Sequence, residues 1–80
     1  MQVDSTQWVS DTPTVKTRYQ LANSGIHLLW ASKVEPPNVD DEAVSIEPPG
    51  EVIVLPANIT YFFRIPEDKN PTDLRKTEVA

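Results

Sequence analysis

Hydrophobic and polar residues alternate with a period of two along residues 15–21 and again along residues 26–31. Because successive side chains of a strand point to opposite faces, this period predicts two β-strands, each with one face in a core. The intervening Asn23 and Gly25 tolerate the positive φ angles of tight turns, so the two strands are expected to pair as a hairpin. The expected core face is carried by Val15, Thr17, Tyr19, Leu21, Ile26, Leu28 and Trp30.

A second pair of β-rich runs, residues 52–55 and 59–65, flanks a short turn centred on Ala57. The first run is continuously apolar, which is typical of a strand buried on both faces, whereas the second run alternates. Pro56 and Asn58 suit the turn, and this role of Asn58 is favoured over glycosylation of its Asn-Ile-Thr sequon. Another hairpin is therefore expected, with Ile59, Tyr61, Phe63 and Ile65 in the core and Thr60, Phe62 and Arg64 on the opposite face.

The segments outside these runs alternate less clearly. Residues 1–13 hold few apolar groups and predict an N-terminal arm, whose Trp8 indole must pack back on the domain or enter a neighbour's pocket. Prolines bracket residues 43–46, which predicts a short edge strand because proline cannot donate to a β ladder. Residues 67–80 are expected to form a solvated loop and then a last strand or a tail.

No window of the sequence places apolar residues at helical spacing beside a cap, so the chain is expected to be all-β. We expect a small β-sandwich or barrel of about five to seven short antiparallel strands with extended termini. The 80 residues are expected to form a single domain, with an arm at 1–13, a β-core at 14–66 and a C-terminal strand or tail at 67–80. A chain of this length buries only roughly 60% of its unfolded surface, so oligomerisation or docking should add stability.

The net negative charge of the chain disfavours two classes of partner, nucleic acids and anionic membranes. The formal net charge of −5 and the pI of about 4.6 disfavour contact with phosphate backbones and anionic lipids. No apolar run has the length of a membrane span, and the first residues lack the regions of a signal peptide. We therefore expect no nucleic-acid partner, no membrane partner, and a chain that is made and used in soluble form.

Groups suited to catalysis are sparse. The chain has no cysteine and one imidazole, His27, so a thiolate metal site and a cysteine–histidine pair are both excluded. The serines lie in no nucleophile-elbow pattern, and the two glycines are too few for a phosphate-binding loop. Asp40, Asp41 and Glu42 with Glu35 could bind Ca²⁺, but they lack EF-hand spacing, so a solvated acidic loop is preferred. We expect no enzymatic activity, no cofactor and no metal.

Aromatic residues provide the candidate contacts. Most rings fall on the expected core faces, which leaves Trp8 and Phe62 as the rings expected to be exposed. Because Phe62 and Phe63 are adjacent in one strand, one ring must be covered by another layer or be presented to a partner. Trp8, Phe62 and the C-terminal Val79 are therefore the predicted interface residues.

The sequence Arg-Tyr-Gln-Leu-Ala-Asn-Ser-Gly at residues 18–25, the segment 46–50 and the aromatic strand 61–65 resemble small virion structural proteins of tailed bacteriophages. The resemblance spans roughly residues 15–66 and is to the capsid decoration or cement type. It implies a compact β-sandwich or barrel, present in many copies, that docks on the major capsid protein or another virion subunit and forms a homo-oligomer. It also implies synthesis in the host cytoplasm and a final place in the virion, and it brings no catalytic residues.

The expected function is accordingly that of a non-enzymatic structural protein that stabilises the capsid lattice. The alternative is a glycan- or receptor-binding β-module, such as part of a tail fibre, in which Trp8 or Trp30 stacks on a sugar ring. A third class, an accessory subunit of a larger enzyme, is left open by a sequence that names no partner.

Overall fold

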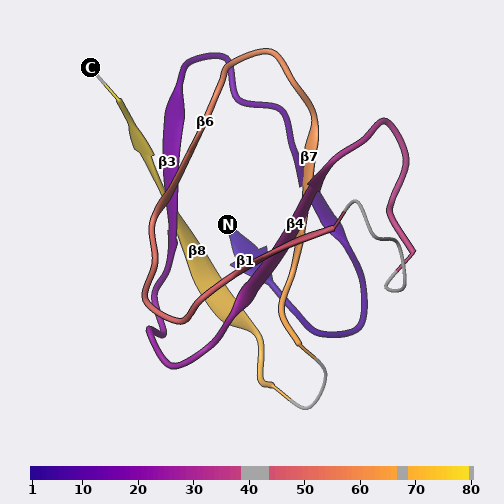
Figure 1. Ribbon diagram of the computed structural model, residues 1–80, viewed down its shortest axis with the longest axis vertical. Coiled ribbons are helices and arrows are strands. Elements are labelled where there is room, and N and C mark those ends of the chain that lie inside the picture. Colours follow the sequence, from indigo (N-terminus) through magenta and orange to yellow (C-terminus); the bar gives the residue numbers. More distant parts are fainter. Residues whose placement is uncertain (39–43, 67–68, 80) are drawn as a thin grey trace.

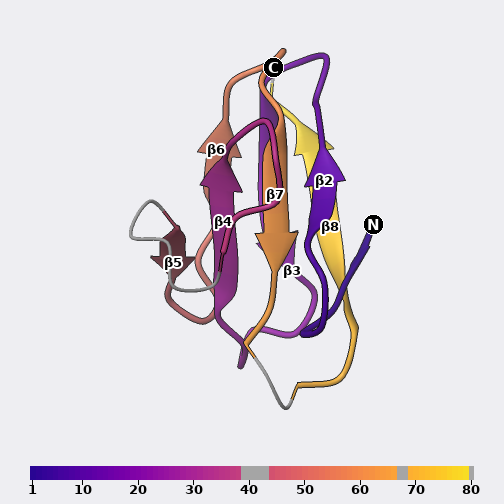
Figure 2. The same cartoon turned by 90° about the vertical axis from the view of Figure 1, so that its right-hand side faces the viewer.

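The computed structural model describes residues 1–38, 44–66 and 69–79. Within these residues the chain forms eight β-strands and no helix, arranged as two antiparallel sheets of four strands (Figure 1). The sheets face each other as a sandwich (Figure 2), so the predicted all-β sandwich is confirmed, although with more strands than expected. The strands are β1 (Gln2–Val3), β2 (Val9–Asp11), β3 (Thr17–Leu21), β4 (Leu28–Ser32), β5 (Ser45–Glu47), β6 (Ile53–Leu55), β7 (Tyr61–Arg64) and β8 (Thr72–Glu78).

Neither predicted hairpin is present. One sheet has the strand order β1-β8-β3-β6 and the other has the order β2-β7-β4-β5, so β3 and β4 lie in different sheets, as do β6 and β7. The predicted turns are real, and Asn58 has a positive φ of 65°, but each carries the chain across the sandwich. Turn residues permit a reversal of direction without specifying the strand that receives it, which explains the error.

The pairing of β3 with β6 and of β4 with β7 gives the strand connectivity of immunoglobulin-type sandwiches. In that architecture the first strand lies beside the second and the last strand lies beside the penultimate one. Here the ends are exchanged, since the C-terminal β8 lies beside β3 and the N-terminal β2 lies beside β7. The predicted edge strand is confirmed, because β5 pairs only with β4 at the end of its sheet.

Residues 1–13 are therefore not the predicted extended arm, because they contribute a strand to each sheet. The crossing between β1 and β2 is held by Asp4, whose Oδ1 accepts hydrogen bonds from the backbone N–H of Thr6 (2.8 Å) and Gln7 (3.0 Å). The carbonyl of Asp4 also accepts the N–H of Ile65 at 3.1 Å. At the other end of the chain, β8 confirms the strand alternative for the C-terminal segment.

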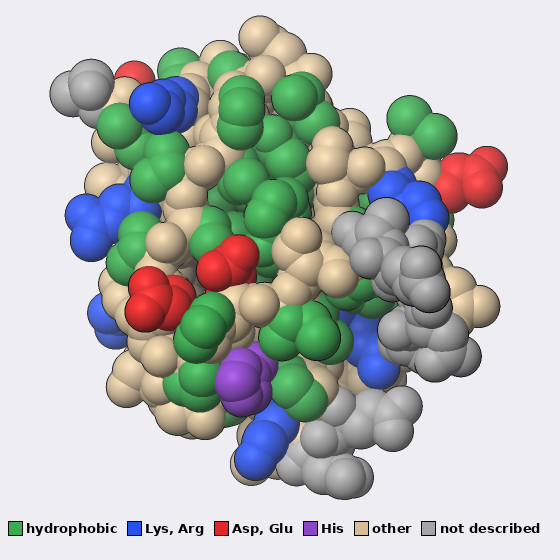
Figure 3. Space-filling view, in the orientation of Figure 1, with side chains coloured by type: hydrophobic (Ala, Val, Ile, Leu, Met, Phe, Trp, Pro, Cys, Tyr) green, Lys and Arg blue, Asp and Glu red, His purple; other side chains and the backbone are tan. Residues whose placement is uncertain are grey.

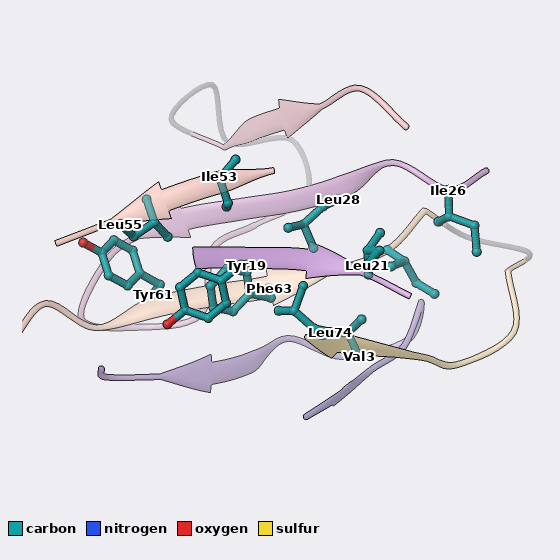
Figure 4. Packing of buried hydrophobic residues seen from close by; sticks show 11 residues of the cluster. Val3, Tyr19, Leu21, Ile26, Leu28, Ile53, Leu55, Tyr61, Phe63 and Leu74 are labelled. Atoms are coloured by element: carbon teal, nitrogen blue, oxygen red, sulfur yellow. The ribbon is translucent and has the colours of Figure 1, made fainter. Parts of the chain in front are cut away.

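The core lies between the two sheets and is centred on an aromatic pair (Figure 4). The rings of Tyr19 on β3 and Phe63 on β7 lie with their centroids 4.8 Å apart. The Tyr19 hydroxyl donates to Oδ2 of Asp11 on β2 at 2.6 Å. Burial, together with this carboxylate, raises the pKa of Tyr19 well above its usual value. One side chain thus joins three strands from both sheets.

Tyr61 links the start of β7 to the turn before it. Its hydroxyl donates to the carbonyl of Pro56 at 3.1 Å, which is the arrangement called a tyrosine corner in immunoglobulin-type sandwiches. In antibody domains the second cysteine of the inter-sheet disulfide follows that tyrosine by two residues, which is the position of Phe63 here. The contact between Tyr19 and Phe63 therefore takes the place of the disulfide in this cysteine-free chain.

The predicted core faces are largely confirmed, with three exceptions. Val15 and Ile59 are each 41% exposed, because each lies two residues before its strand begins. Val54 is 45% exposed, because β6 is an edge strand with one outward face and is not buried on both faces as predicted. The predicted residues that are buried are Thr17, Tyr19, Leu21, Ile26, Leu28, Tyr61, Phe63 and Ile65, while Trp30 is half-buried against this cluster.

We predict that Tyr61→Phe lowers the free energy of unfolding by about 0.5–1.5 kcal/mol, because it removes one neutral hydrogen bond and keeps the ring. Tyr19→Phe should cost more, about 1.5–3 kcal/mol, because its acceptor is a carboxylate. Urea unfolding followed by tryptophan fluorescence measures both. Equal losses in the two variants would contradict the distinction between the acceptors.

We also predict that Asp4→Asn lowers the melting temperature at pH 7 but not in acid. The N–H groups of Thr6 and then Gln7 bond the charged carboxyl and lower the pKa of Asp4 below its usual 3.8. A lowered folded-state pKa stabilises the fold above the unfolded-state pKa, and this stabilisation is lost as the pH falls through the folded-state pKa. The difference between variant and wild type should therefore shrink as the pH falls below the usual aspartate pKa of 3.8. Glu51→Gln, at another exposed carboxylate, is the control, and an equal loss at both pH values would reject the electrostatic explanation.

Candidate functional site

Phe62 is buried rather than exposed. Only 7% of its surface is accessible, and its ring lies on the outer face of the β2-β7-β4-β5 sheet, opposite to the inward-facing Phe63. The loop formed by residues 33–38, which contains the buried Pro37, passes over this outer face (Figure 2). The expectation of an exposed Phe62 ring is therefore wrong, because the chain's own loop supplies the covering layer.

Trp8 packs back on its own domain, which is one of the two alternatives predicted for its indole. The guanidinium carbon of Arg64 lies 5.6 Å from the centre of the Trp8 ring, which is a cation–π arrangement, and the indole is half-buried. Val79 is also half-buried, and its N–H donates to the carbonyl of Lys16 at 2.9 Å, beyond the end of β8. The fold therefore does not bring the three predicted interface residues into one surface.

Exposed aliphatic residues instead meet at one end of the sandwich. Val34 is 94% exposed, and it lines a hollow of about 340 Å³ together with Ile59. The rest of the lining is polar and consists of Ser32, Lys33, Asn58 and Thr60. We call this feature the loop-end hollow.

One wall of the loop-end hollow, the turn of residues 58–60, is bonded to the segment that follows β2. The N–H of Asn58 donates to the carbonyl of Pro13 at 2.7 Å, and the hydroxyls of Thr12 and Thr60 are 2.8 Å apart. Hydrophobic side chains gather in a band that runs from this end of the molecule down its centre (Figure 3). The hollow thus combines two exposed aliphatic side chains with four polar residues, on a turn that is bonded to a neighbouring segment.

Sequence reasoning missed this hollow. Alternation predicts a core position for Ile59, because Ile59 continues the pattern of the following strand. Val34 stands alone between Lys33 and Glu35, in a segment without alternation. The available signal was weak: a single aliphatic residue between two charged ones, shortly before a proline pair.

The residues suited to catalysis or metal binding are not brought together in the part of the chain that the structure describes. His27 is exposed, with Nδ1 3.1 Å from the carbonyl of Glu47. In residues 1–38, 44–66 and 69–79, no three His, Cys, Asp or Glu side chains are grouped to hold a metal ion. The acidic residues 40–42, considered above for Ca²⁺, lie outside the described residues.

Trp30, the other tryptophan considered for sugar stacking, is held within the fold. Its indole N–H donates to Oε1 of Glu47 at 2.9 Å, and its ring meets Tyr61 edge-on with centroids 6.1 Å apart. Both tryptophans therefore have ring contacts inside the chain.

Comparisons of the chain with protein-family models, with curated proteins and with solved structures found no match. Among the described residues there is also no helix of the length and apolar character needed to cross a membrane. A sandwich of this connectivity carries many unrelated functions, so the architecture alone implies none. The surface of this chain is consequently what indicates a function.

We predict that Phe62→Ala lowers the free energy of unfolding by about 3–5 kcal/mol, because the lost ring leaves a cavity beneath the covering loop. Trp8→Ala should cost less, because the indole is only half-buried. Chemical unfolding monitored by far-UV circular dichroism distinguishes the two variants. A Phe62→Ala protein as stable as the wild type would mean that the ring does not support the fold.

Proposed function

We propose that the protein is a non-enzymatic structural protein of a virus particle, which docks on the capsid lattice and stabilises it as a decoration protein. The observation that carries this proposal is the loop-end hollow, in which Val34, 94% exposed, and Ile59 stand beside a concave surface. Scattered apolar residues are normal on a protein surface, but two exposed aliphatic residues that line one hollow together with polar residues favour a protein partner.

The construction of the hollow suits docking. Asn58 and Thr60 are bonded to Pro13 and Thr12, in the segment that follows β2, so the turn that carries Ile59 is held before a partner arrives. A surface that is already ordered loses little conformational entropy on binding, which favours affinity for a given area.

The size of the protein is also consistent with repeated use on a lattice. One copy of an 80-residue chain offers a small contact area, and its single-site affinity is expected to be modest. Many copies on neighbouring sites of one particle, or copies that touch each other, raise the effective affinity without any new type of contact. The virion location and the major capsid protein as partner come from the phage resemblance and are part of this proposal.

We predict that Val34→Asp and Ile59→Asp each weaken binding to capsids assembled without the protein by about tenfold or more. The reason is that a carboxylate placed in an apolar contact loses its hydration without gaining a partner. Co-sedimentation of purified protein with the particles measures the binding. Ile46→Asp is the matched control, because Ile46 is 64% exposed on β5 and does not line the hollow.

Unchanged particle binding by both hollow variants, or an equal loss in Ile46→Asp, would reject the hollow as the docking surface. Binding of the wild type to a glycan array, abolished by Trp8→Ala, would instead favour the carbohydrate-binding alternative.

A further inference from the structure

Positive charge gathers on the outer face of the β1-β8-β3-β6 sheet, in a chain whose formal net charge is −5. Tyr19, Leu21 and Leu74 point into the core, so the alternating residues Arg18 and Arg75 point outward, and both are exposed. Lys and Arg side chains are seen over β3 and β8 along the left of Figure 3. We call the outward residues of this sheet the basic face.

The register places the two arginines close together. Arg18 lies opposite Thr77, and Arg75 lies opposite Gln20, so the arginines are diagonal neighbours on adjacent strands. Diagonal neighbours of an antiparallel pair are separated by about 7–8 Å at the backbone, within reach of long side chains. Lys16, which is exposed and precedes β3, continues the row of Arg18.

These two arginines are not neutralised within the part of the chain that the structure describes. Lys76 is paired there with Asp11 at 3.3 Å, whereas neither Arg18 nor Arg75 has an ion pair or hydrogen bond from its side chain. Of the two acidic residues on these four strands, Asp73 points outward and is bonded to the chain's own N-terminal ammonium at 3.2 Å. Glu78 is exposed at the end of β8, on the alternate row opposite Thr17. Neighbouring like charges repel, so the pair does not help the isolated fold.

Aliphatic side chains flank the arginines. Val54 on β6 lies directly opposite Arg18 and is 45% exposed. Val79 follows the outward row of β8 and is bonded through its N–H to Lys16, which returns one predicted interface residue to a candidate surface. Arginine is enriched at protein interfaces relative to the rest of the surface.

We propose that the basic face is a second docking surface, which takes a carboxylate-rich surface of a neighbouring protein in the assembly. The guanidinium groups of Arg18 and Arg75 can each bind a carboxylate through two parallel hydrogen bonds. A polynucleotide fits less well, because its closely spaced phosphates would also meet the acidic remainder of the chain. This inference rests on the proposed docking function, and it gives each copy a second contact, since none of the residues that line the loop-end hollow belongs to this face.

The first test measures binding of a labelled poly-L-glutamate peptide by fluorescence anisotropy, with a DNA duplex as the comparison probe. Wild type should bind the peptide at about 50 mM salt and release it near 300 mM, because surface charges are screened. The double variant Arg18→Gln/Arg75→Gln should lose about tenfold or more in affinity. Lys69→Gln, an exposed lysine outside the face, should bind as the wild type does. Tighter binding of DNA than of the peptide, or unchanged binding by the double variant, would overturn the proposal.

The second test uses capsids assembled without the protein and separates this inference from the proposed function. Loss of particle binding in both Val34→Asp and the arginine double variant supports two docking surfaces. Loss only in Val34→Asp rejects the basic face and leaves the proposed function standing. The wild type could also associate with itself at low salt while the double variant does not. That result would assign the face to contacts between copies of this chain and would overturn the proposal of a different, acidic partner. Because both arginines are exposed, the double variant should keep the wild-type urea midpoint, which controls for folding.

Discussion

The contact between Tyr19 and Phe63 is the interaction on which the two sheets depend. The rings are 4.8 Å apart at the centre of the sandwich, and the Tyr19 hydroxyl reaches Asp11 on a third strand. In a chain of 80 residues without cysteine, no disulfide holds the sheets together. The buried aromatic and aliphatic core, the Tyr19–Asp11 hydrogen bond and the Lys76–Asp11 ion pair do so instead. The tyrosine corner at Tyr61 fixes the turn before the strand that carries Phe63. The position of this strand, β7, then directs Phe63 into the core and Phe62 to the outer face of the sheet.

Both ends of the chain are strands, and this limits the surfaces that are free for contact. Because the segment of residues 1–13 crosses from one sheet to the other, it closes one side of the sandwich and uses Trp8 in a contact with Arg64. An exchanged arm between copies is therefore not needed to explain these residues. The loop-end hollow and the basic face are both left uncovered by this segment.

The two outer faces of the sandwich differ because a loop covers only one of them. Residues 33–38 pass over the face that contains Phe62 (Figure 2), and the same loop presents Val34 at its start. The outer face of the other sheet carries exposed arginines with no apolar ring to hide. One element thus buries an aromatic residue and supplies the exposed aliphatic group of the proposed contact. The two proposed surfaces differ in chemistry, so salt concentration should affect them unequally.

The sequence by itself determined the all-β class, the inward faces of residues 17–21 and 61–65, and the edge position of the proline-bracketed strand. Alternation defines which face of a strand is buried, but it does not specify the neighbouring strand, and the same turn residues serve a hairpin and a crossing between sheets. Only the tertiary structure decided that β3 and β4 separate, that the termini exchange places, and that Phe62 is covered.

The candidate surfaces also divide into a part that the sequence predicts and a part that only the fold shows. The row of Lys16 and Arg18 could be read from alternation, whereas its union with Arg75 and Val54 required the strand register. The loop-end hollow joins residues 32–34 to 58–60 through a loop without periodicity, and local sequence carries no signal for such a contact.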